Sequence, residues 1–269
     1  MVREARMESE TGFYHVMVRG INKEKILEKE KEKERILMLI KEKRQDVLCR
    51  IVAYCVMDNH MHMIIIAEKS ELVKIMKKIN ISYAMSYNQR HDRVGPVFQG
   101  RFRSENITDE AYLYGAIRYI HNNPIKAGLV SKPEEYKWSS LREYLNDTPI
   151  IIDEKIKEEI LNGFVSAKDF LDFHRIEDDT NYLEIKEEAE QLKEKKAKRI
   201  INNYFEEKRI TDKGQVKGKD MEELLKKLLN ETDLSYRKIA DLTGTNLRII
   251  HKVNKTLRNN LYRSPYSSP

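Results

Sequence analysis

The chain is poor in cysteine and has no long apolar run. Its two cysteines, Cys49 and Cys55, are not spaced as C-x-x-C, and two thiols on one expected strand cannot bridge each other. We therefore expect both to be reduced core thiols in a bacterial cytoplasm. Residues 1–10 are charged and carry no apolar h-region, which predicts no signal peptide. The longest apolar stretches, such as Met61–Ala67, are far too short to cross a membrane, so we expect no membrane partner.

A nucleotide-binding P-loop is also missing. The segment Gly95–Gly100 has the glycine spacing of a Walker A loop, but Arg101 and Phe102 follow where Lys and Ser or Thr are required. Chemistry driven by nucleotide hydrolysis is therefore not expected.

The composition indicates a globular chain with much charge at its surface. Of 269 residues, 40% are hydrophobic and 35% are charged, which suits one or two domains with a solvated surface. Lys and Arg number 50 against 44 Asp and Glu, giving a net charge of +6. This excess of positive charge is compatible with a polyanionic partner but does not by itself indicate one.

Hydrophobic periodicity predicts an α+β fold in the first half of the chain. The expected strands and helices alternate as β-α-β-β-α-β, the order of a ferredoxin-like sandwich. The expected strands are 13–20, 48–57, 59–67 and 101–108, and the expected helices are 24–44, 71–90 and 109–123. We expect Thr108 to cap the last helix and Pro124 to stop it. The mixed charges of Glu28–Arg35 predict a solvated helix face.

The sequence divides into three parts. Residues 1–145 hold the expected sandwich, residues 146–219 read as a charged helical connector, and residues 220–269 as a compact helical unit. The lysine- and glycine-containing segment Lys213–Lys219 is typical of a linker.

His60 and His62 form the sharpest local motif. Side chains two apart on a strand point the same way, so the two imidazoles share a face about 7 Å apart along the strand. This spacing lets both bind one cation, and Asp58 on the same face could add a carboxylate or orient a histidine. Two histidines that only pack and hydrogen-bond remain the alternative.

Tyr119 and Asn123 are the second motif. They are four residues apart near the end of an expected helix and so lie on one face, a turn apart. A phenol can attack a phosphodiester and become linked to the phosphate, and an amide oxygen beside it can complete a metal site. The alternative is a packed Tyr followed by an Asn that caps the helix before Pro124.

Five blocks in order resemble the REP-associated tyrosine transposases, relatives of the HUH single-tyrosine insertion-sequence transposases. The resemblance covers about residues 13–145. The blocks are Tyr14–Gly20, Ala53–His62, Gly95–Phe102, Tyr119–Val130 and Trp138–Tyr144.

The resemblance implies a metal-dependent HUH domain. It makes His60, His62 and Asn123 the ligands of Mg²⁺ or Mn²⁺, and Tyr119 the nucleophile that retains a 5′ phosphate on single-stranded, hairpin-forming DNA. The sequence departs from the family at Asp58, which usually is proline, and at Asn122, which commonly is apolar.

The group that takes the phenol proton is left open. A free tyrosine has a pKa of about 10, so a base is required at neutral pH. His121 is the nearest candidate in sequence but points elsewhere on a helix; metal-bound hydroxide and the substrate phosphate are the alternatives. Tyr112, two turns earlier on nearly the same face, is the rival nucleophile.

A basic segment with interleaved aromatics suggests a DNA-handling surface. Cations follow a phosphate backbone and aromatic rings stack on unpaired bases. The expected DNA-binding residues of this part are Arg19, Arg90, Arg93, Phe98, Arg101, Arg103 and Arg118. Arg19 and Arg118 lie near the expected site and could clamp the scissile phosphate, whereas Phe98 is open to a core role.

The C-terminal segment Tyr236–Lys255 fits a helix-turn-helix, with Gly244 at the turn. We expect Ile239, Ala240, Ile250 and Val253 to be buried. After Thr245 the chain has no acidic residue and five basic ones, Arg248, Lys252, Lys255, Arg258 and Arg263. This one-sided charge favours duplex DNA binding over a generic helical hairpin.

Three functions remain in competition. The first is a transposase-like single-strand DNA endonuclease and strand transferase. The second is a non-catalytic helix-turn-helix regulator with a structural HUH-like domain, against which the complete set of His60, His62, Tyr119 and Asn123 argues. The third is an RNA-binding ferredoxin-like domain, which lacks aromatic RNP strands. A homodimer stays open.

Overall fold

The structure is a computed structural model with two compact units, Met1–Leu183 and Glu184–Pro269. It describes residues 7–146, 150–176, 182–183, 186–210, 216 and 218–261, and in 186–192 and 258–261 the backbone alone. Each unit has its own hydrophobic core. Among these described residues, no helix is long and apolar enough to span a membrane.

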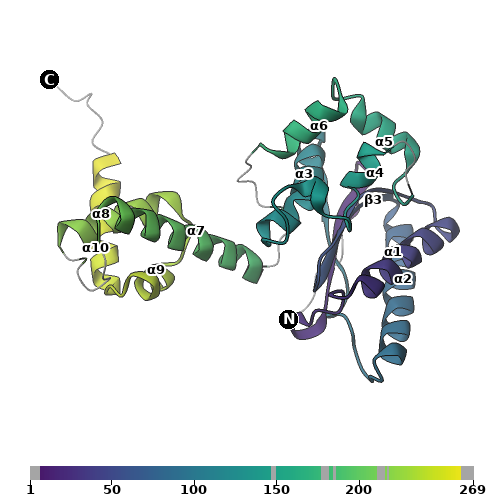
Figure 1. The fold of residues 1–269 in the computed structure, drawn as a ribbon, viewed down its shortest axis with the longest axis horizontal. Coiled ribbons are helices and arrows are strands. Elements are labelled where there is room, and N and C mark those ends of the chain that lie inside the picture. The colour runs from purple at the N-terminus through teal and green to yellow at the C-terminus, as the bar shows by residue number, and fades with distance from the viewer. Residues whose placement is uncertain are drawn as a thin grey trace. The chain divides into compact units, whose positions relative to one another are not determined.

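The first unit is built on a four-stranded antiparallel sheet (Figure 1). Its strands lie in the order β2-β3-β1-β4. In chain order the elements are β1 (Phe13–Arg19), α1 (Glu30–Lys43), β2 (Cys49–Val56), β3 (His60–Ala67), α2 (Lys69–Arg90), β4 (Arg103–Asn106) and α3 (Glu110–Lys126). The predicted ferredoxin-like β-α-β-β-α-β order is confirmed.

Both faces of the sheet are covered. Figure 1 shows α1 and α2 on one side of the sheet and α3 on the other. All of β1 except its first residue is buried, and so is β3 except for Ile66, so polar side chains on these strands are enclosed as well. Because strand side chains alternate, His15, His60 and His62 point to the α3 face, while Tyr14 and Met61 point to the α1 and α2 face.

The charged run at the start of α1 is not wholly solvated, as the sequence had suggested. The helix begins at Glu30, after a 3₁₀ turn at Ile21–Lys23, and Glu32 and Lys33 are buried. Glu32 accepts hydrogen bonds from Arg90 at 2.6 Å and from the Tyr83 hydroxyl at 3.0 Å. Burial of a charge is tolerated where a partner neutralises it, and these partners come from α2.

The ends of α3 differ from the prediction. Asp109, and not Thr108, is the N-cap, because its carboxylate accepts the Tyr112 amide hydrogen at 2.8 Å. Pro124 does not stop the helix, which continues to Lys126. Proline removes a single donor, and the last turn is closed by the hydrogen bond from the Ala127 amide to the Asn123 carbonyl.

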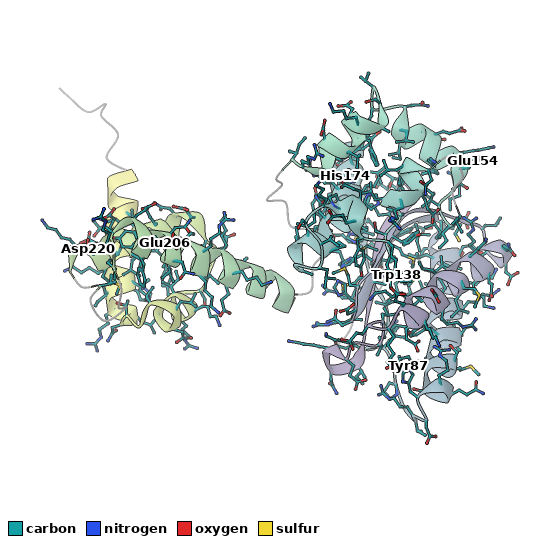
Figure 2. The ribbon with its side chains drawn as sticks, viewed as in Figure 1. Tyr87, Trp138, Glu154, His174, Glu206 and Asp220 are labelled. Atoms are coloured by element: carbon teal, nitrogen blue, oxygen red, sulfur yellow. The ribbon has the colours of Figure 1, made fainter. Side chains whose placement is uncertain are left out.

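The chain after α3 folds onto the free edge of β2. The Val56 amide donates to the Trp138 carbonyl, and the Ser140 amide to the Tyr54 carbonyl, each at 2.9 Å. Trp138 is labelled beside the sheet in Figure 2. A 3₁₀ turn (Pro133–Glu135) and the helices α4 (Leu141–Leu145), α5 (Glu154–Leu161) and α6 (Ala167–His174) follow.

Glu143 on α4 fixes this covering segment. Its carboxylate accepts the Tyr54 hydroxyl at 2.6 Å and the amide hydrogens of Ile150, Ile151 and Ile152 at 2.7, 2.8 and 3.0 Å. Part of the expected connector, residues 146–219, therefore packs on the first unit.

The second unit is helical throughout its described elements. These are α7 (Lys186–Glu207), α8 (Lys219–Glu231), α9 (Tyr236–Thr243) and α10 (Leu247–Leu261). Ile239, Ile250 and Val253 are buried as expected, and Ala240 is half-buried. Gly244 ends α9 with a φ of 70°, a conformation that favours glycine. Most of the expected linker, 213–219, lies outside the described residues.

Candidate functional site

The two histidines of β3 lie on one buried face, as their spacing predicted. His60 is 5% exposed and His62 is 1% exposed, and their ring centroids are 5.0 Å apart. Across the sheet, Arg19 is opposite His60 and Met17 is opposite His62. The register thus places the Arg19 cation beside His60 and the apolar Met17 side chain beside His62.

His15 on β1 supports His62, and sequence reasoning missed it. Nε2 of His15 and Nδ1 of His62 are 3.0 Å apart and share a hydrogen bond. Within the described part of the chain, His62 Nε2 is buried without a hydrogen-bond partner. If His62 Nδ1 donates this hydrogen, the lone pair stands on Nε2, the atom that would face a cation.

Asn59 orients the His60 ring through a hydrogen bond to its Nδ1. Its side-chain oxygen lies 2.7 Å from His60 Nδ1 and accepts that hydrogen, which leaves the lone pair on Nε2. Both imidazoles are thus oriented by neighbours, one within the turn before β3 and one across the sheet.

Burial keeps this cluster neutral. Desolvation lowers the pKa of His15 to about 3 and that of His60 to about 4, where the Arg19 cation lowers it further. Desolvation also holds the pKa of His62 well below its ordinary value, with the His60 and His15 rings as further causes. Metal ligation requires neutral imidazole, so at pH 7 these rings are in the form that binds a metal.

Asp58 does not join the histidines. Its carboxylate lies 2.7 Å from the Lys33 ammonium on α1, in a largely buried ion pair. The extra negative charge at this position is therefore neutralised by α1. Neither of the roles suggested by its shared face, ligand or histidine partner, is formed.

Tyr119 of α3 lies over the histidines. Its ring centroid is 5.7 Å from that of His62, edge to face, and 6.1 Å from that of His15. Asn123, one turn later, donates its amide hydrogen to the Tyr119 carbonyl at 3.0 Å. Both side chains are buried, at 6% and 8% exposure. The structure therefore brings the ring of the expected nucleophile against His62 and His15, while His60 contacts His62.

The rival tyrosine stands apart from the histidines. The Tyr112 ring packs on Tyr182, with centroids 5.3 Å apart, and no ring contact joins it to a histidine in the described structure. Burial raises the pKa of the Tyr112 hydroxyl further above its ordinary value. The geometry favours Tyr119 over Tyr112.

The donor set suits a hard or borderline divalent cation. No three side chains among His, Cys, Asp and Glu are arranged to hold a metal ion within the described residues. Asn123 can offer its amide oxygen as a third ligand, since its amide nitrogen is the atom bonded to the Tyr119 carbonyl. Two imidazole nitrogens and one amide oxygen, with water in the remaining positions, fit Mn²⁺ better than Mg²⁺, which prefers oxygen ligands.

Comparison with known proteins gives one family for this part of the chain. Residues 9–123 match the family model described as "Transposase IS200 like". A solved structure of a REP-associated tyrosine transposase bound to a REP hairpin is similar to the chain, with 19% identity over 58% of this chain and 93% of that one and a TM-score of 0.47. No curated protein matches the chain.

Arg19 and Arg103 of the first unit act electrostatically on the histidines, whereas Arg118 packs on α6. Arg19, 8% exposed, lies across the sheet from His60 and lowers its pKa. Arg103 on β4 contributes to the lowered pKa of His62. Arg118 is turned toward α6, with its guanidinium 4.7 Å from the Phe173 ring centroid.

Lys126 is a further cation at the site that sequence reasoning missed. Its ammonium lies 4.4 Å from the Tyr119 ring centroid and contributes to the lowered pKa of His62. The sequence predicted that this helix ends before Pro124, so Lys126 was not placed on the helix face of Tyr119.

Among the remaining expected DNA contacts of the first unit, two arginines are ion-paired, one arginine is exposed and the phenylalanine is buried. Arg90 and Arg93 pair with Glu32 and Glu24 at 2.6 and 2.5 Å, and Arg101 is exposed. Phe98 is 8% exposed and packs on Tyr83 in the core, so its expected stacking on a base is corrected to a packing role.

His121 is directed away from Tyr119. Its Nδ1 lies 2.8 Å from His174 Nε2 and its Nε2 lies 2.8 Å from the Ser140 hydroxyl, so both nitrogens are bonded. Burial keeps its pKa well below the ordinary value. This ring joins α3 to His174 at the end of α6, the residue labelled in Figure 2, and is not placed to take the phenol proton.

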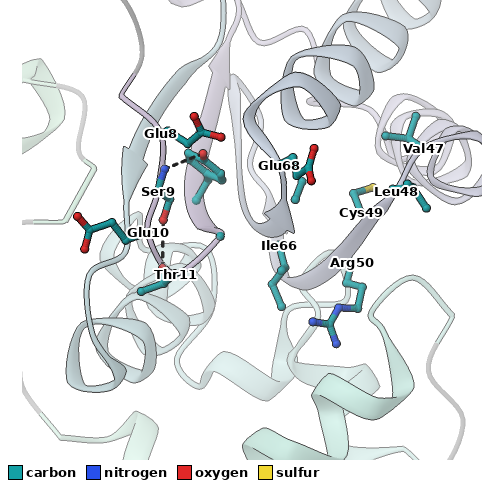
Figure 3. Close-up of a pocket in the computed structure, with 13 residues that line it drawn as sticks. Glu8, Ser9, Glu10, Thr11, Val47, Leu48, Cys49, Arg50, Ile66 and Glu68 are labelled. Carbon is teal, nitrogen blue, oxygen red and sulfur yellow. Dashed lines mark hydrogen bonds between the residues drawn. The ribbon is translucent and has the colours of Figure 1, made fainter.

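One hollow of the first unit has the wrong charge for a polyanion. It lies where β2 begins and β3 ends, at the other end of β3 from His60 (Figure 3). Glu8, Glu10 and Glu68 line it against a single cation, Arg50. We assign no DNA contact to it.

On the second unit, Arg248, Lys252 and Lys255 are exposed on α10. The Arg258 side chain and all of Arg263 lie outside the described residues.

Proposed function

We propose that the first unit is a metal-dependent single-strand DNA endonuclease and strand transferase of the transposase kind. The observation that carries this proposal is the contact of Tyr119 with the neutral, oriented imidazole of His62 on a buried face. A phenol beside a neutral imidazole whose buried Nε2 lacks a hydrogen-bond partner within the described residues suits cation-assisted phosphodiester transfer to tyrosine.

In the proposed reaction the Tyr119 oxygen attacks the scissile phosphorus. The bond to the 3′ oxygen breaks, the phenol proton is lost, and the departing 3′ oxygen takes up a proton. The phosphotyrosine retains the 5′ phosphate, so attack by another 3′ hydroxyl reverses the step and joins strands without nucleotide hydrolysis. A cation held by His60, His62 and Asn123 would supply charge neutralisation at the non-bridging oxygens.

The substrate we propose is single-stranded DNA that forms hairpins. This part of the proposal is supported by the family of residues 9–123 and by the cations Arg19 and Arg103 beside the histidines. Cations at a nucleophile bind and orient the phosphate that it attacks.

The experiment is adduct formation on labelled hairpin oligonucleotides with Mg²⁺ or Mn²⁺. We expect a covalent protein–DNA product that Tyr119→Phe loses, with DNA binding retained because the ring remains. The matched control is Tyr112→Phe, which should form adduct at the wild-type rate. Peptide mapping that finds the DNA on Tyr112, or full cleavage by the wild type in EDTA, contradicts the proposal.

Substitution of the metal ligands separates chemistry from binding. We expect His60→Ala or His62→Ala to abolish cleavage while hairpin binding persists, because the imidazoles would act on the reacting phosphate and not on the duplex stem. Loss of binding together with cleavage would indicate a structural role for the pair.

The second unit supports an added role in duplex DNA binding. Arg248, Lys252 and Lys255 are exposed on α10, which follows α9 after a turn of three residues, Gly244 to Asn246. A protein without adduct formation that still binds duplex DNA through these residues would favour the regulator function instead.

A further inference from the structure

A basic pocket borders Tyr119 beside the histidine face. It is formed by the C-terminal half of α3, the loop after it, the end of α6 and Tyr182. Tyr119 itself is one of its walls. The pocket lies within the first unit.

The charge of this pocket suits a phosphate. Its charged lining comprises four cationic side chains, Arg118, Lys126, Lys132 and Arg175, and one acidic one, Glu134. Arg175 is paired with Asp172 at 2.5 Å, which weakens one of the four. His174, the other titratable group on α6 here, is neutral because burial lowers its pKa to about 4. The remaining balance is cationic.

The apolar walls of the pocket suit a nucleobase. Ile125, Pro133 and Tyr182 line it beside the cations. The Tyr182 ring lies 5.2 Å from that of Tyr119, in a groove of α3 that exists because residue 115 is glycine. A Cβ at Gly115 would lie 1.8 Å from the Tyr182 hydroxyl, so the position of this wall depends on that glycine. Aromatic and apolar walls beside cations are the features with which proteins bind unpaired nucleotides.

Lys126 connects the pocket to the reacting atoms. Its ammonium lies over the Tyr119 ring at 4.4 Å and acts electrostatically on His62. A phosphate bound to the Tyr119 oxygen would therefore be beside this cation, and the nucleotide attached to that phosphate would be at the mouth of the pocket.

We propose that this pocket binds the nucleotide on the 3′ side of the cleavage point, the one that stays joined to Tyr119 through its 5′ phosphate. The inference rests on the proposed function. It assigns Lys126 and Lys132 to the phosphate, and Tyr182 with Pro133 to the base. Retention of this nucleotide would keep the covalent end in place until a 3′ hydroxyl arrives.

The test is binding of a short probe to the full chain, without chemistry. The probe is a random pool of 5′-phosphorylated deoxytrinucleotides with a 3′ fluorophore, followed by fluorescence anisotropy. We expect the variant with Lys126→Gln and Lys132→Gln to bind it at least about tenfold more weakly, since contacts to a charged phosphate are worth that much. We also expect a 5′-hydroxyl pool to bind the wild type about tenfold more weakly than the phosphorylated pool.

The matched control carries the same charge change on the opposite side of the sheet. Lys41→Gln with Lys77→Gln alters two exposed lysines of α1 and α2 and should bind the probe as the wild type does. Thermal unfolding verifies that both variants are folded. Unchanged binding by the pocket variant, an equal loss in the control, or equal binding of the 5′-hydroxyl and 5′-phosphorylated pools would each overturn the inference.

These outcomes are separate from those of the proposed function. If Tyr119 forms adduct while the pocket variant binds the probe normally, only the pocket assignment fails. If the pocket variant loses the probe and no adduct forms on any hairpin, the nucleotide site stands and the proposed chemistry fails.

Discussion

Replacement of His15 by alanine should weaken metal binding without touching a metal ligand. His15 is fully buried and hydrogen-bonds His62 Nδ1 at 3.0 Å. Without that partner, the His62 ring loses the contact that sets its orientation and its tautomer. Only a fraction of the protein molecules then has the His62 ring in the orientation and tautomer that present the Nε2 lone pair to the cation.

The size of the effect follows from the role of such outer partners. Their loss typically costs 10- to 100-fold in metal affinity, about 1.4–2.7 kcal/mol. The variant should also be less stable by about 1–3 kcal/mol, because His62 Nδ1 is left buried without a partner. His15→Gln, whose amide can accept the same hydrogen, should recover part of the affinity.

Calorimetric titration with Mn²⁺ measures the affinity, and urea unfolding measures the stability. The structure supplies a matched control in its second buried histidine pair, His121 and His174, with ring nitrogens 2.8 Å apart. His174→Ala should lose comparable stability and keep the Mn²⁺ affinity of the wild type. A folded His15→Ala protein with unchanged Mn²⁺ affinity, or an equal loss in His174→Ala, would refute the reasoning.

Three further predictions concern other parts of the chain. Because burial lowers the pKa of His174 from 6.5 to about 4, the unfolded chain binds this proton over a range where the folded chain does not, so its contribution to stability should be full above pH 6.5 and fall toward pH 4. Urea midpoints should fall less steeply as the pH is lowered in His174→Ala, without becoming flat, because the other buried histidines titrate in the same sense. Gly115→Ala should destabilise the protein, since its Cβ would lie 1.8 Å from the Tyr182 hydroxyl. In a Tyr182→Ala background the same substitution should stabilise the protein by about 1 kcal/mol, because alanine favours helix more than glycine does. Urea unfolding of the two single variants and the double variant checks this change of sign. Arg248→Gln and Lys252→Gln should each reduce the slope of log affinity against log salt for duplex DNA by about one, and unchanged slopes would exclude phosphate contacts at α10.

Local periodicity predicted the elements and the core of the site. The two-residue period placed His60 and His62 on one face, and the four-residue helical spacing placed Asn123 a turn from Tyr119. These relations lie within single elements, so a sequence read alone contains them.

Contacts between distant segments were not predictable in the same way. His15 and His62 are 47 residues apart and meet only because β1 pairs with β3 in one register. Arg90 was expected to bind DNA because a charge count cannot show that Glu32, on another helix, already pairs with it.

Lys126 was missed for a different reason. It follows Tyr119 by seven residues, almost two full helical turns, and so shares its face if the helix continues. The rule that proline ends a helix removed it from consideration. Pro124 lies in the final turn, where the loss of one donor is easily tolerated.

The backbone that covers β2 has a consequence for self-association. An exposed edge strand is a template on which a second copy of a protein can add its own sheet. Here the Val56 amide donates to the Trp138 carbonyl, and the Tyr54 carbonyl accepts from the Ser140 amide. These backbone groups of β2 are therefore not open to the hydrogen bonds of another chain's strand. Two copies therefore cannot merge their sheets through β2 without first unpacking the segment that Glu143 holds in place.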